Sequence, residues 1–335
     1  MVQSGQQQAV VVARHPDGMP IDADFSLVEH ALPRRGPGEL LLRVLWLSLD
    51  PYLFPLLCGR HIGRRPMPGE IVPGIALAEV IESDEPRLPP GTRVVAETGW
   101  CEVAAVPADA VRAVDPDLAP GASALGVLGQ PGLTAWVGMR DIARPQAGEV
   151  MLVSAAAGVV GSVAGQLAKA AGCRVVGIAG TRERCDFVVD AYGFDACIAR
   201  HDGDFPQRLR QACPDGIDMY FDNAGGPVLE AALGVLRRGA RIVLCGLMDQ
   251  YGRAERPPGP NLAPLIGSRA RMEGLVVYDH LQRFDECVAE LAPMLRDGRL
   301  RAHDDVADGL GNAPAHFIAM LRGQNLGKSL VRVAG

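Results

Sequence analysis

Between about residues 121 and 300, short apolar runs alternate with helical stretches. The apolar runs are EVMLVSA, CRVVGIAG, ACIAR, DMYFDN, ARIVLCGL and RMEGLVVY, and the helical stretches are 159–171, 182–192, 205–212, 227–237 and 281–297. Strands that are apolar on both faces, alternating with helices, are typical of a parallel sheet that helices cover on both sides. This alternation predicts a doubly wound α/β fold of the Rossmann type.

The first 120 residues follow a different rhythm. Five apolar or alternating runs, QAVVVAR, GELLLRVLWLSL, GIALAEVIES, GTRVVAET and CEVAAVP, are separated by proline and glycine. This spacing indicates a barrel or sandwich of short strands. The chain has 335 residues, too many for one hydrophobic core, and its tail carries a last strand in NLGKSLVRV. We expect a β-rich domain of residues 1–120 and 301–335 around an α/β domain of residues 121–300.

A glycine turn lies between the first strand and helix of the α/β region. VSAAAGVVGS (153–162) has the dinucleotide fingerprint G-x-G-x-x-G except that Ala156 replaces the first glycine. Gly158 would let a pyrophosphate approach the backbone, Val159 and Val160 would open a helix whose N–H groups face the phosphates, and Gly161 would permit close packing. The alternative is that the glycines serve only helix-to-sheet packing.

The end of the second strand bears on the choice between NAD and NADP. NAD sites place a carboxylate there for the ribose, whereas NADP sites use arginine for the 2′-phosphate. Here the strand ends in GIAGTRERC, with Arg182 and Arg184 directly after it. Glu183 is the one candidate for a ribose carboxylate, but it falls within the following helix. The pattern favours NADP(H), and the alternative is a solvated helix face in an arginine-rich chain.

Composition excludes several other classes. The chain has 33 basic and 39 acidic residues, a formal charge of −6, and no basic stripe, which argues against nucleic-acid binding. The uncharged stretch 150–168 is broken by glycine, serine and glutamine, so we expect no membrane span. None of the eight cysteines forms C-x-x-C, and no signal peptide is evident. These features suit a reduced, cytoplasmic protein.

Several motifs along nearly the whole chain resemble one family. They are LSLDPY (47–52), GQPGLTAW (129–136), SAAAGVVGS, PDGIDMYFDNAGG (214–226), CGLMDQY (245–251) and NLGKSLV (325–331). They are similar to the zinc-independent medium-chain dehydrogenases/reductases, in the branch of prostaglandin reductase, leukotriene B4 12-hydroxydehydrogenase and curcumin reductase. The resemblance implies a GroES-like catalytic domain around a Rossmann domain, a homodimer, and NADPH-dependent reduction of the carbon–carbon double bond of α,β-unsaturated ketones or aldehydes.

The same resemblance implies roles for individual residues. Gly158 to Gly161 would hold the pyrophosphate. Arg184 stands where the family usually has a lysine on the 2′-phosphate, and Arg200 stands where a tyrosine often contacts it. The residues that would line the rest of the cofactor are Asn223, Cys245, Gly246, Leu247, Tyr251, Leu275, Val276, Val277 and Asn325.

The resemblance also places a functional hydroxyl at Tyr251. Hydride transfer to the β-carbon of an enone leaves negative charge on the carbonyl oxygen, and a phenol O–H directed there would stabilise the enolate. The phenol or a water would then supply the proton. The alternative is a loop tyrosine that only covers the cofactor.

Rival chemistries find less support. Cys58 and His61 are spaced like half a metal site, but a zinc site needs three or four ligands and no second pair is evident, so we expect no metal. No tyrosine is followed by lysine four residues later, which excludes a short-chain dehydrogenase. Tyr52, Phe54 and His61 either shape a substrate pocket or pack the barrel. NADPH:quinone oxidoreductase and a non-catalytic NADPH-binding protein remain as alternative functions.

Overall fold

The computed structural model describes residues 5–115, 117, 121–251, 255 and 257–334. The chain divides into two compact units: the β-rich unit, Met1–Leu125 with Asp304–Gly335, and the Rossmann unit, Gly126–His303. The sequence suggested boundaries after residues 120 and 300, and residue 120 lies outside the described residues.

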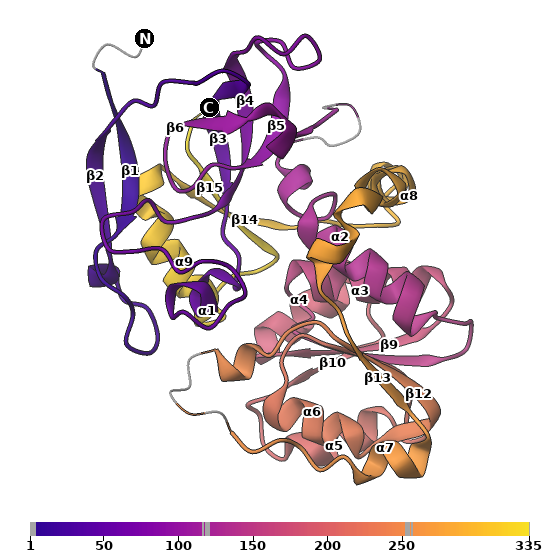
Figure 1. Ribbon diagram of the computed structural model, residues 1–335. Helices are drawn as coiled ribbons and strands as arrows, with labels where there is room; N and C mark the ends of the chain where they lie inside the picture. The colour runs from indigo at the N-terminus through magenta and orange to yellow at the C-terminus, as the bar shows by residue number, and fades with distance from the viewer. Residues whose placement is uncertain (1–4, 116, 118–120, 252–254, 256, 335) are drawn as a thin grey trace. The chain divides into compact units, whose positions relative to one another are not determined.

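The Rossmann unit is built on a parallel sheet (Figure 1). Its six strands lie in the order β10-β9-β8-β11-β12-β13, and every neighbouring pair is parallel. Their bounds are β8 Val150–Ser154, β9 Arg174–Ala179, β10 Ala196–Ala199, β11 Ile217–Asp222, β12 Leu236–Leu244 and β13 Arg271–Gly274. This is the strand order of dinucleotide-binding folds, with its switch point between β8 and β11. The predicted fold class is confirmed.

Helices cover both faces of this sheet, as Figure 1 shows. One face carries α3 (Val159–Ala170) and α4 (Arg182–Tyr192), and α2 (Gln130–Val137) contacts both α3 and α8 (Phe284–Arg296). The other face carries α5 (Phe205–Ala212), α6 (Gly226–Leu233) and α7 (Ala263–Ser268). Buried Leu152, Val176, Tyr220 and Ile242 pack from the sheet against Leu209 and Val228 of these helices. The continuous apolar strands are explained by this two-sided cover.

Three predicted element boundaries are wrong. The helix expected at 227–237 ends at Leu233, and Leu236 already begins β12. Pairing decides this: the N–H of Ile217 donates to Val235, and Leu236 lies opposite Ile217 in the sheet. The strand expected through RMEGLVVY ends at Gly274 and gives way to 3₁₀ turns at Val277–Arg283, so the next helix begins at Phe284 instead of residue 281.

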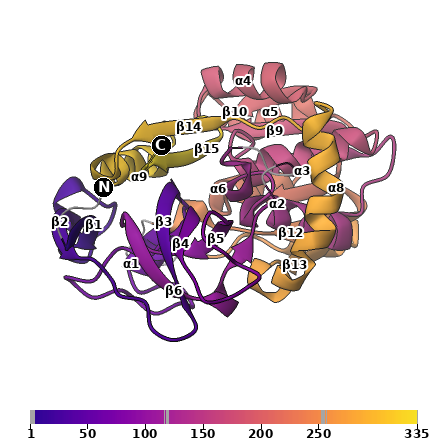
Figure 2. The same ribbon diagram turned by 90° about the horizontal axis from the view of Figure 1, so that it is seen from above.

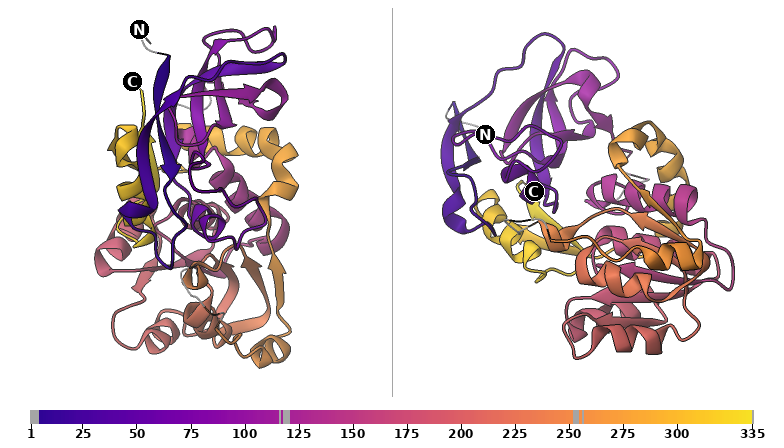
Figure 3. Two further views of the ribbon diagram at one scale, coloured as in Figure 1. Left: turned by 60° about the vertical axis from the view of Figure 1, so that its left-hand side comes forward. Right: turned by 60° about the horizontal axis from the view of Figure 1, so that its bottom comes forward.

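The β-rich unit contains two sheets (Figures 2 and 3). A hairpin pairs β1 (Gln6–Val12) with β2 (Phe25–Ala31). A seven-stranded sheet has the order β14-β15-β3-β4-β5-β7, with β6 also paired to β3. Its bounds are β3 Glu39–Ser48, β4 Ile75–Glu82, β5 Arg93–Glu97, β6 Val103–Pro107, β7 Arg112–Ala113, β14 Asp304–Asp308 and β15 Lys328–Arg332. The β-rich unit also contains the helices α1 (Leu53–Leu57) and α9 (Ala313–Leu321).

Aromatic packing marks the core of the β-rich unit. Trp100 is fully buried, stacks on Phe25 with ring centroids 5.7 Å apart, and meets Phe317 of α9 edge to face at 5.7 Å. Because Phe317 comes from the C-terminal part of the chain, this cluster joins both ends of the sequence in one core.

Short 3₁₀ helices occur at Asp22–Asp24, Ala108–Ala110, Ser123–Leu125, Met248–Gln250 and Leu310–Asn312, and a π-helical turn at Gly138–Ala143. Within the described ranges, no helix has the length and apolar character to cross a membrane.

Candidate cofactor and active site

Nearly all the predicted site residues of the Rossmann unit follow the carboxyl ends of its strands. Gly158 to Gly161 follow β8, Arg184 follows β9, Arg200 follows β10, Asn223 follows β11, Cys245 to Leu247 and Tyr251 follow β12, and Leu275 to Val277 follow β13. Since the strands are parallel, these ends share one edge of the sheet. Ligands of open α/β sheets bind at that edge, beside the switch point.

The two glycines of the turn have different reasons to be glycine. A Cβ on Gly161 would lie 2.5 Å from the carbonyl oxygen of Ala155, so the helix could not pack against the turn. A Cβ on Gly158 would lie an ordinary 3.4 Å from the same oxygen. Gly158 is also the N-cap of α3, where no side chain satisfies the first N–H groups. Packing explains Gly161, whereas Gly158 leaves room for a ligand such as a pyrophosphate at the helix N-terminus.

The missing first glycine is compensated by the neighbouring strand. Ala156 is fully buried, and its N–H donates to the carbonyl of Ile178 at 3.0 Å. Its methyl group lies 2.9 Å from where a Cβ on Gly177 of β9 would be. Gly177 thus supplies the space that the alanine needs. The left-handed residue of the turn is Ala155, with φ of 50°.

Arg184 and Arg200 both lie near the carboxyl end of β9. The Nη1 atom of Arg184 lies 4.0 Å from where a Cβ on Gly180 would be, and the backbone N–H of Arg200 donates to Ala179 at 2.9 Å. Arg182 instead forms an ion pair with Asp202 at 3.1 Å. Arg184 and Arg200 thus bring two positive charges near this edge, which a 2′-phosphate requires.

The rival carboxylate is exposed in the first turn of α4. Hydrogen bonding to its own backbone N–H and to Thr181 lowers the pKa of Glu183. The Thr181 hydroxyl also accepts from the N–H of Arg184 as the N-cap of α4. Glu183 thus lies within α4, beyond the strand end where an NAD site places its ribose carboxylate.

A buried polar network joins the ends of β8 and β11. Asn223 donates its N–H to the Ser154 hydroxyl and its Nδ2 to the Ser154 carbonyl, both at 2.8 Å. Ser154 and Tyr220 donate in turn to Oδ1 of Asp222, at 3.1 and 2.7 Å. Asp222 is fully buried, and burial raises its pKa. We did not anticipate Ser154 or Asp222 from the sequence; the signal available was a polar pair at the end of an apolar strand.

Tyr251 lies beside this network. The N–H groups of Cys245 and Gly246 donate to the carbonyl of Asp222 at 2.9 and 3.1 Å, which folds the end of β12 onto the end of β11. A Cβ on Gly246 would lie 3.2 Å from the Asn223 carbonyl and 3.6 Å from the Tyr251 hydroxyl. Burial raises the pKa of Tyr251, and burial with Asp222 nearby raises that of Cys245 to about 12. Both groups are neutral, so the phenol is a hydrogen-bond donor.

The last strand of the sheet contributes a short extended segment. The N–H of Leu275 donates to the carbonyl of Leu244 at 2.9 Å, and its side chain is buried. Val276 is 47% exposed, and Val277 opens the 3₁₀ turns. Leu247, after β12, is 38% exposed. These exposed apolar groups offer a surface on which a nicotinamide or adenine ring could pack.

The remaining predicted residues belong to the β-rich unit. Asn325 is 9% exposed and donates Nδ2 to the carbonyl of Gly327 at 3.0 Å. Phe54 in α1 is 2% exposed, which favours the packing interpretation for this residue. Tyr52 and His61 are partly exposed, with ring centroids 5.5 Å apart, and burial lowers the pKa of His61. These two rings form a small aromatic surface beside α1.

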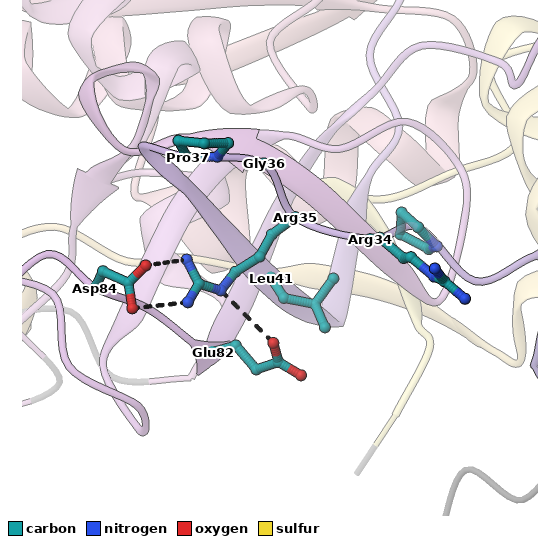
Figure 4. A pocket seen from close by; sticks show the side chains of 8 residues that line it. Arg34, Arg35, Gly36, Pro37, Leu41, Glu82 and Asp84 are labelled. Carbon is teal, nitrogen blue, oxygen red and sulfur yellow. Dashed lines mark hydrogen bonds and ion pairs between the residues drawn. The ribbon is translucent and has the colours of Figure 1, made fainter.

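A polar surface pocket of about 510 Å³ also lies in the β-rich unit (Figure 4). Its central side chain, Arg35, forms an ion pair with Asp84 at 2.6 Å and with Glu82 at 3.6 Å. The Arg35 guanidinium is the main cause that lowers the pKa of Asp84. Arg34 also lines the pocket, so two arginines face two carboxylates and the pocket carries no net positive charge for a phosphate.

Comparisons with known proteins agree with this arrangement. Residues 8–114 match the family model described as N-terminal domain of oxidoreductase, and residues 159–293 match that of zinc-binding dehydrogenase. The chain is 39% identical to NADPH-dependent curcumin reductase of Escherichia coli (strain K12), covering 97% of this chain and 96% of that protein. It is 32% identical to 2-alkenal reductase (NADP(+)-dependent) of Nicotiana tabacum, covering 100% and 99%. CurA from Vibrio vulnificus in complex with NADPH superposes with a TM-score of 0.92 at 37% identity, covering 98% and 99%.

One of the two matching family models carries zinc in its description. In the part of the chain that the structure describes, no group of three or more His, Cys, Asp or Glu side chains could hold a metal ion. The two candidate ligands, Cys58 and His61, are thus not joined by a third. The full-length relatives decide the assignment: the chain belongs to the medium-chain dehydrogenase/reductase family, in the branch of the curcumin and prostaglandin reductases.

Proposed function

We propose that the protein uses NADPH to reduce the carbon–carbon double bond of α,β-unsaturated ketones or aldehydes. One observation carries the proposal: an uncapped helix start at Gly158, two arginines at the end of β9 and a neutral phenol at Tyr251 share one sheet edge. The names of the curcumin and 2-alkenal reductases, to which the chain is similar along its length, support the substrate class.

The cofactor, when bound, supplies a hydride to the β-carbon. In this proposal the backbone N–H groups from Gly158 to Gly161 hold the pyrophosphate, and Arg184 with Arg200 holds the 2′-phosphate. Asn223 is held in place by its two hydrogen bonds to Ser154 and would line the cofactor site at the switch point. The other proposed lining residues of the Rossmann unit are Cys245, Gly246, Leu247, Leu275, Val276 and Val277.

Tyr251 would act on the other end of the conjugated system. Its raised pKa keeps the proton on the phenol, so the hydroxyl can donate to the carbonyl oxygen as negative charge develops there. The enolate then takes a proton at the α-carbon from this phenol or from water. The position of the hydroxyl next to Gly246 and Asn223 keeps it beside the cofactor-binding edge.

Turnover of a small panel tests the reaction class. NADPH and NADH oxidation would be followed with 2-alkenals, enones, a quinone and a saturated ketone. We expect turnover of the enals and enones with a preference for NADPH. Turnover of the quinone alone would favour NADPH:quinone oxidoreductase, and tight NADPH binding without any turnover would favour a non-catalytic NADPH-binding protein.

Replacing Tyr251 by phenylalanine tests its role. Loss of one donor to a developing oxyanion lowers kcat by about a hundredfold, whereas cofactor affinity should change little. Because the folded pKa of Tyr251 is raised above its ordinary value of about 10, the wild-type rate should depend on its proton only above that pH. A kcat that is unchanged in the variant would remove Tyr251 from the mechanism.

We also propose a cytoplasmic homodimer. The eight cysteines are all free thiols, which suits a reducing compartment. Strand β13 ends the sheet of the Rossmann unit, and strand addition at its outer edge would pair two copies. Light scattering on the purified protein, with the expected mass of twice 35.5 kDa, decides the oligomeric state.

A further inference from the structure

Two cysteines without a role in the proposed site lie side by side where α4 packs against β10. Cys185 is on α4 and is 5% exposed, and Cys197 is on β10 and is partly buried. Cys197 packs against Cys185, and the interaction between the two thiols lowers the pKa of Cys185 and raises that of Cys197. Together with Ala179 and Ala199 they form a small cluster of their own.

A glycine on the intervening strand makes this contact possible. Cys197 lies opposite Gly177 in the parallel pairing of β10 with β9. A Cβ on Gly177 would lie only 3.0 Å from the Cys197 sulfur and 2.9 Å from Ala156 of the glycine turn. The sulfur therefore occupies space that any other residue at 177 would fill, on the face of the sheet that α4 covers.

We propose that Cys185 and Cys197 are a modification site, a dithiol that oxidises reversibly to a disulfide linking α4 to β10. The oxidant is hydrogen peroxide or an organic hydroperoxide. The Cys185 thiolate attacks the peroxide, the O–O bond breaks, and a sulfenic acid forms with loss of water or alcohol. The Cys197 sulfur then displaces the hydroxyl group, the S–S bond forms, and a second water carries away its proton. Two thiols are oxidised, the peroxide is reduced, and an external dithiol reverses the change.

The disulfide would act on the proposed 2′-phosphate site, and this step rests on the proposed function. Arg184 directly precedes Cys185, and Arg200 follows Cys197 by only a few residues. Bonded sulfurs lie about 2 Å apart, much closer than hydrogen-bonded thiols, so oxidation draws α4 toward β10. Arg184 then shifts relative to the end of β9. We expect oxidation to weaken NADPH binding about tenfold and NADH binding much less.

Peptide mapping tests the disulfide independently of any activity. Trypsin cleaves after Arg184 and next after Arg200, so both cysteines fall in one peptide, CDFVVDAYGFDACIAR. The reduced full-length protein is treated with hydrogen peroxide, denatured in the presence of an alkylating reagent and digested with trypsin. Mass spectrometry then gives the masses of the peptides. We expect this peptide without alkyl groups and lighter by two hydrogens, and its return to the doubly alkylated form after dithiothreitol. Two alkylated cysteines after peroxide, or oxidation only to sulfinic acids, would overturn the proposal.

Cofactor titrations test the link to the phosphate site. NADPH and NADH dissociation constants are compared for the reduced and oxidised protein, with Cys185→Ser and Cys197→Ser as matched controls that cannot form the disulfide. Cys197→Ala serves if a serine variant does not fold. The peroxide effect on NADPH should vanish in these variants. The disulfide could form without changing NADPH affinity, while Arg184→Ala still weakens NADPH binding. That outcome would reject the effect of the disulfide on the phosphate site and would leave the proposed cofactor site intact. If the reduced protein shows no NADPH preference, the cofactor proposal fails and the peptide map alone decides the disulfide.

Discussion

At the scale of single residues, the two glycines of the turn have different roles: we expect Gly161 to affect stability and Gly158 to affect cofactor binding. Gly161→Ala places a Cβ 2.5 Å from the Ala155 carbonyl, and we expect a loss of about 1–3 kcal/mol in the free energy of unfolding. Gly158→Ala meets only an ordinary 3.4 Å contact, and we expect a loss below about 1 kcal/mol from the poorer N-cap. Urea unfolding measures both, and NADPH titration should show a clear loss of affinity for Gly158→Ala. Equal stability of the two variants would contradict the packing argument.

The arginines at the end of β9 supply a second comparison. Arg184→Ala, alone or with Arg200→Ala, should weaken NADPH binding roughly tenfold or more, because a charge-assisted contact to the 2′-phosphate is lost. NADH has no such phosphate and should bind nearly as before. Arg182→Ala is the matched control, since Arg182 is paired with Asp202 at the surface. Equal losses for both nucleotides would reject the phosphate role of Arg184.

At the scale of elements, Ser154 holds β8 against β11 where the cofactor is expected. Ser154→Ala removes the acceptor of the Asn223 N–H and a donor to buried Asp222, and we expect a loss of about 1–3 kcal/mol. Ser162→Ala is the control, because its hydroxyl donates only within α3, to the Val159 carbonyl. Chemical denaturation checks both variants. Similar small losses would show that the network contributes little to the junction.

The elements also show where the periodicity of apolar residues is sufficient to predict a helix or a strand and where it is not. Long apolar strands and the helix 159–171 follow from local pattern, and the structure places α3 at Val159–Ala170. Leu236 has helical neighbours in sequence but begins β12, because it pairs with Ile217 of β11. Strand β2 was missed altogether: its burial alternates only weakly and it pairs with β1 at the edge of the unit.

At the scale of the whole molecule, the chain's two lysines occupy contrasting ion pairs. Lys328 of β15 is 4% exposed and bonds Asp50 at 2.7 Å, tying the C-terminal strand to the LSLDPY motif. Lys169 is 33% exposed and bonds Asp195 at 2.9 Å. Removing one partner of a buried pair leaves an uncompensated charge, so Lys328→Ala should cost about 3 kcal/mol. Lys169→Ala should cost less than about 1 kcal/mol.

Urea unfolding of the two lysine variants, followed by circular dichroism, gives these free energies. The variants remove the same charge and the same number of side-chain atoms, so the difference between them measures burial. Comparable losses would mean that the Asp50–Lys328 pair is no more important to the β-rich unit than a surface ion pair.

The sequence by itself determined the fold class, because alternating apolar runs and the spacing of a glycine turn are local patterns that a parallel sheet imposes on any chain, and its motifs determined the family. It also led to the residues proposed for the cofactor. Only the tertiary structure decided that Gly177 compensates for Ala156, that Ser154 and Asp222 join two strand ends, and that Cys185 packs against Cys197. Each of these contacts joins residues from separate strands and helices, and such contacts leave no periodic trace in the sequence.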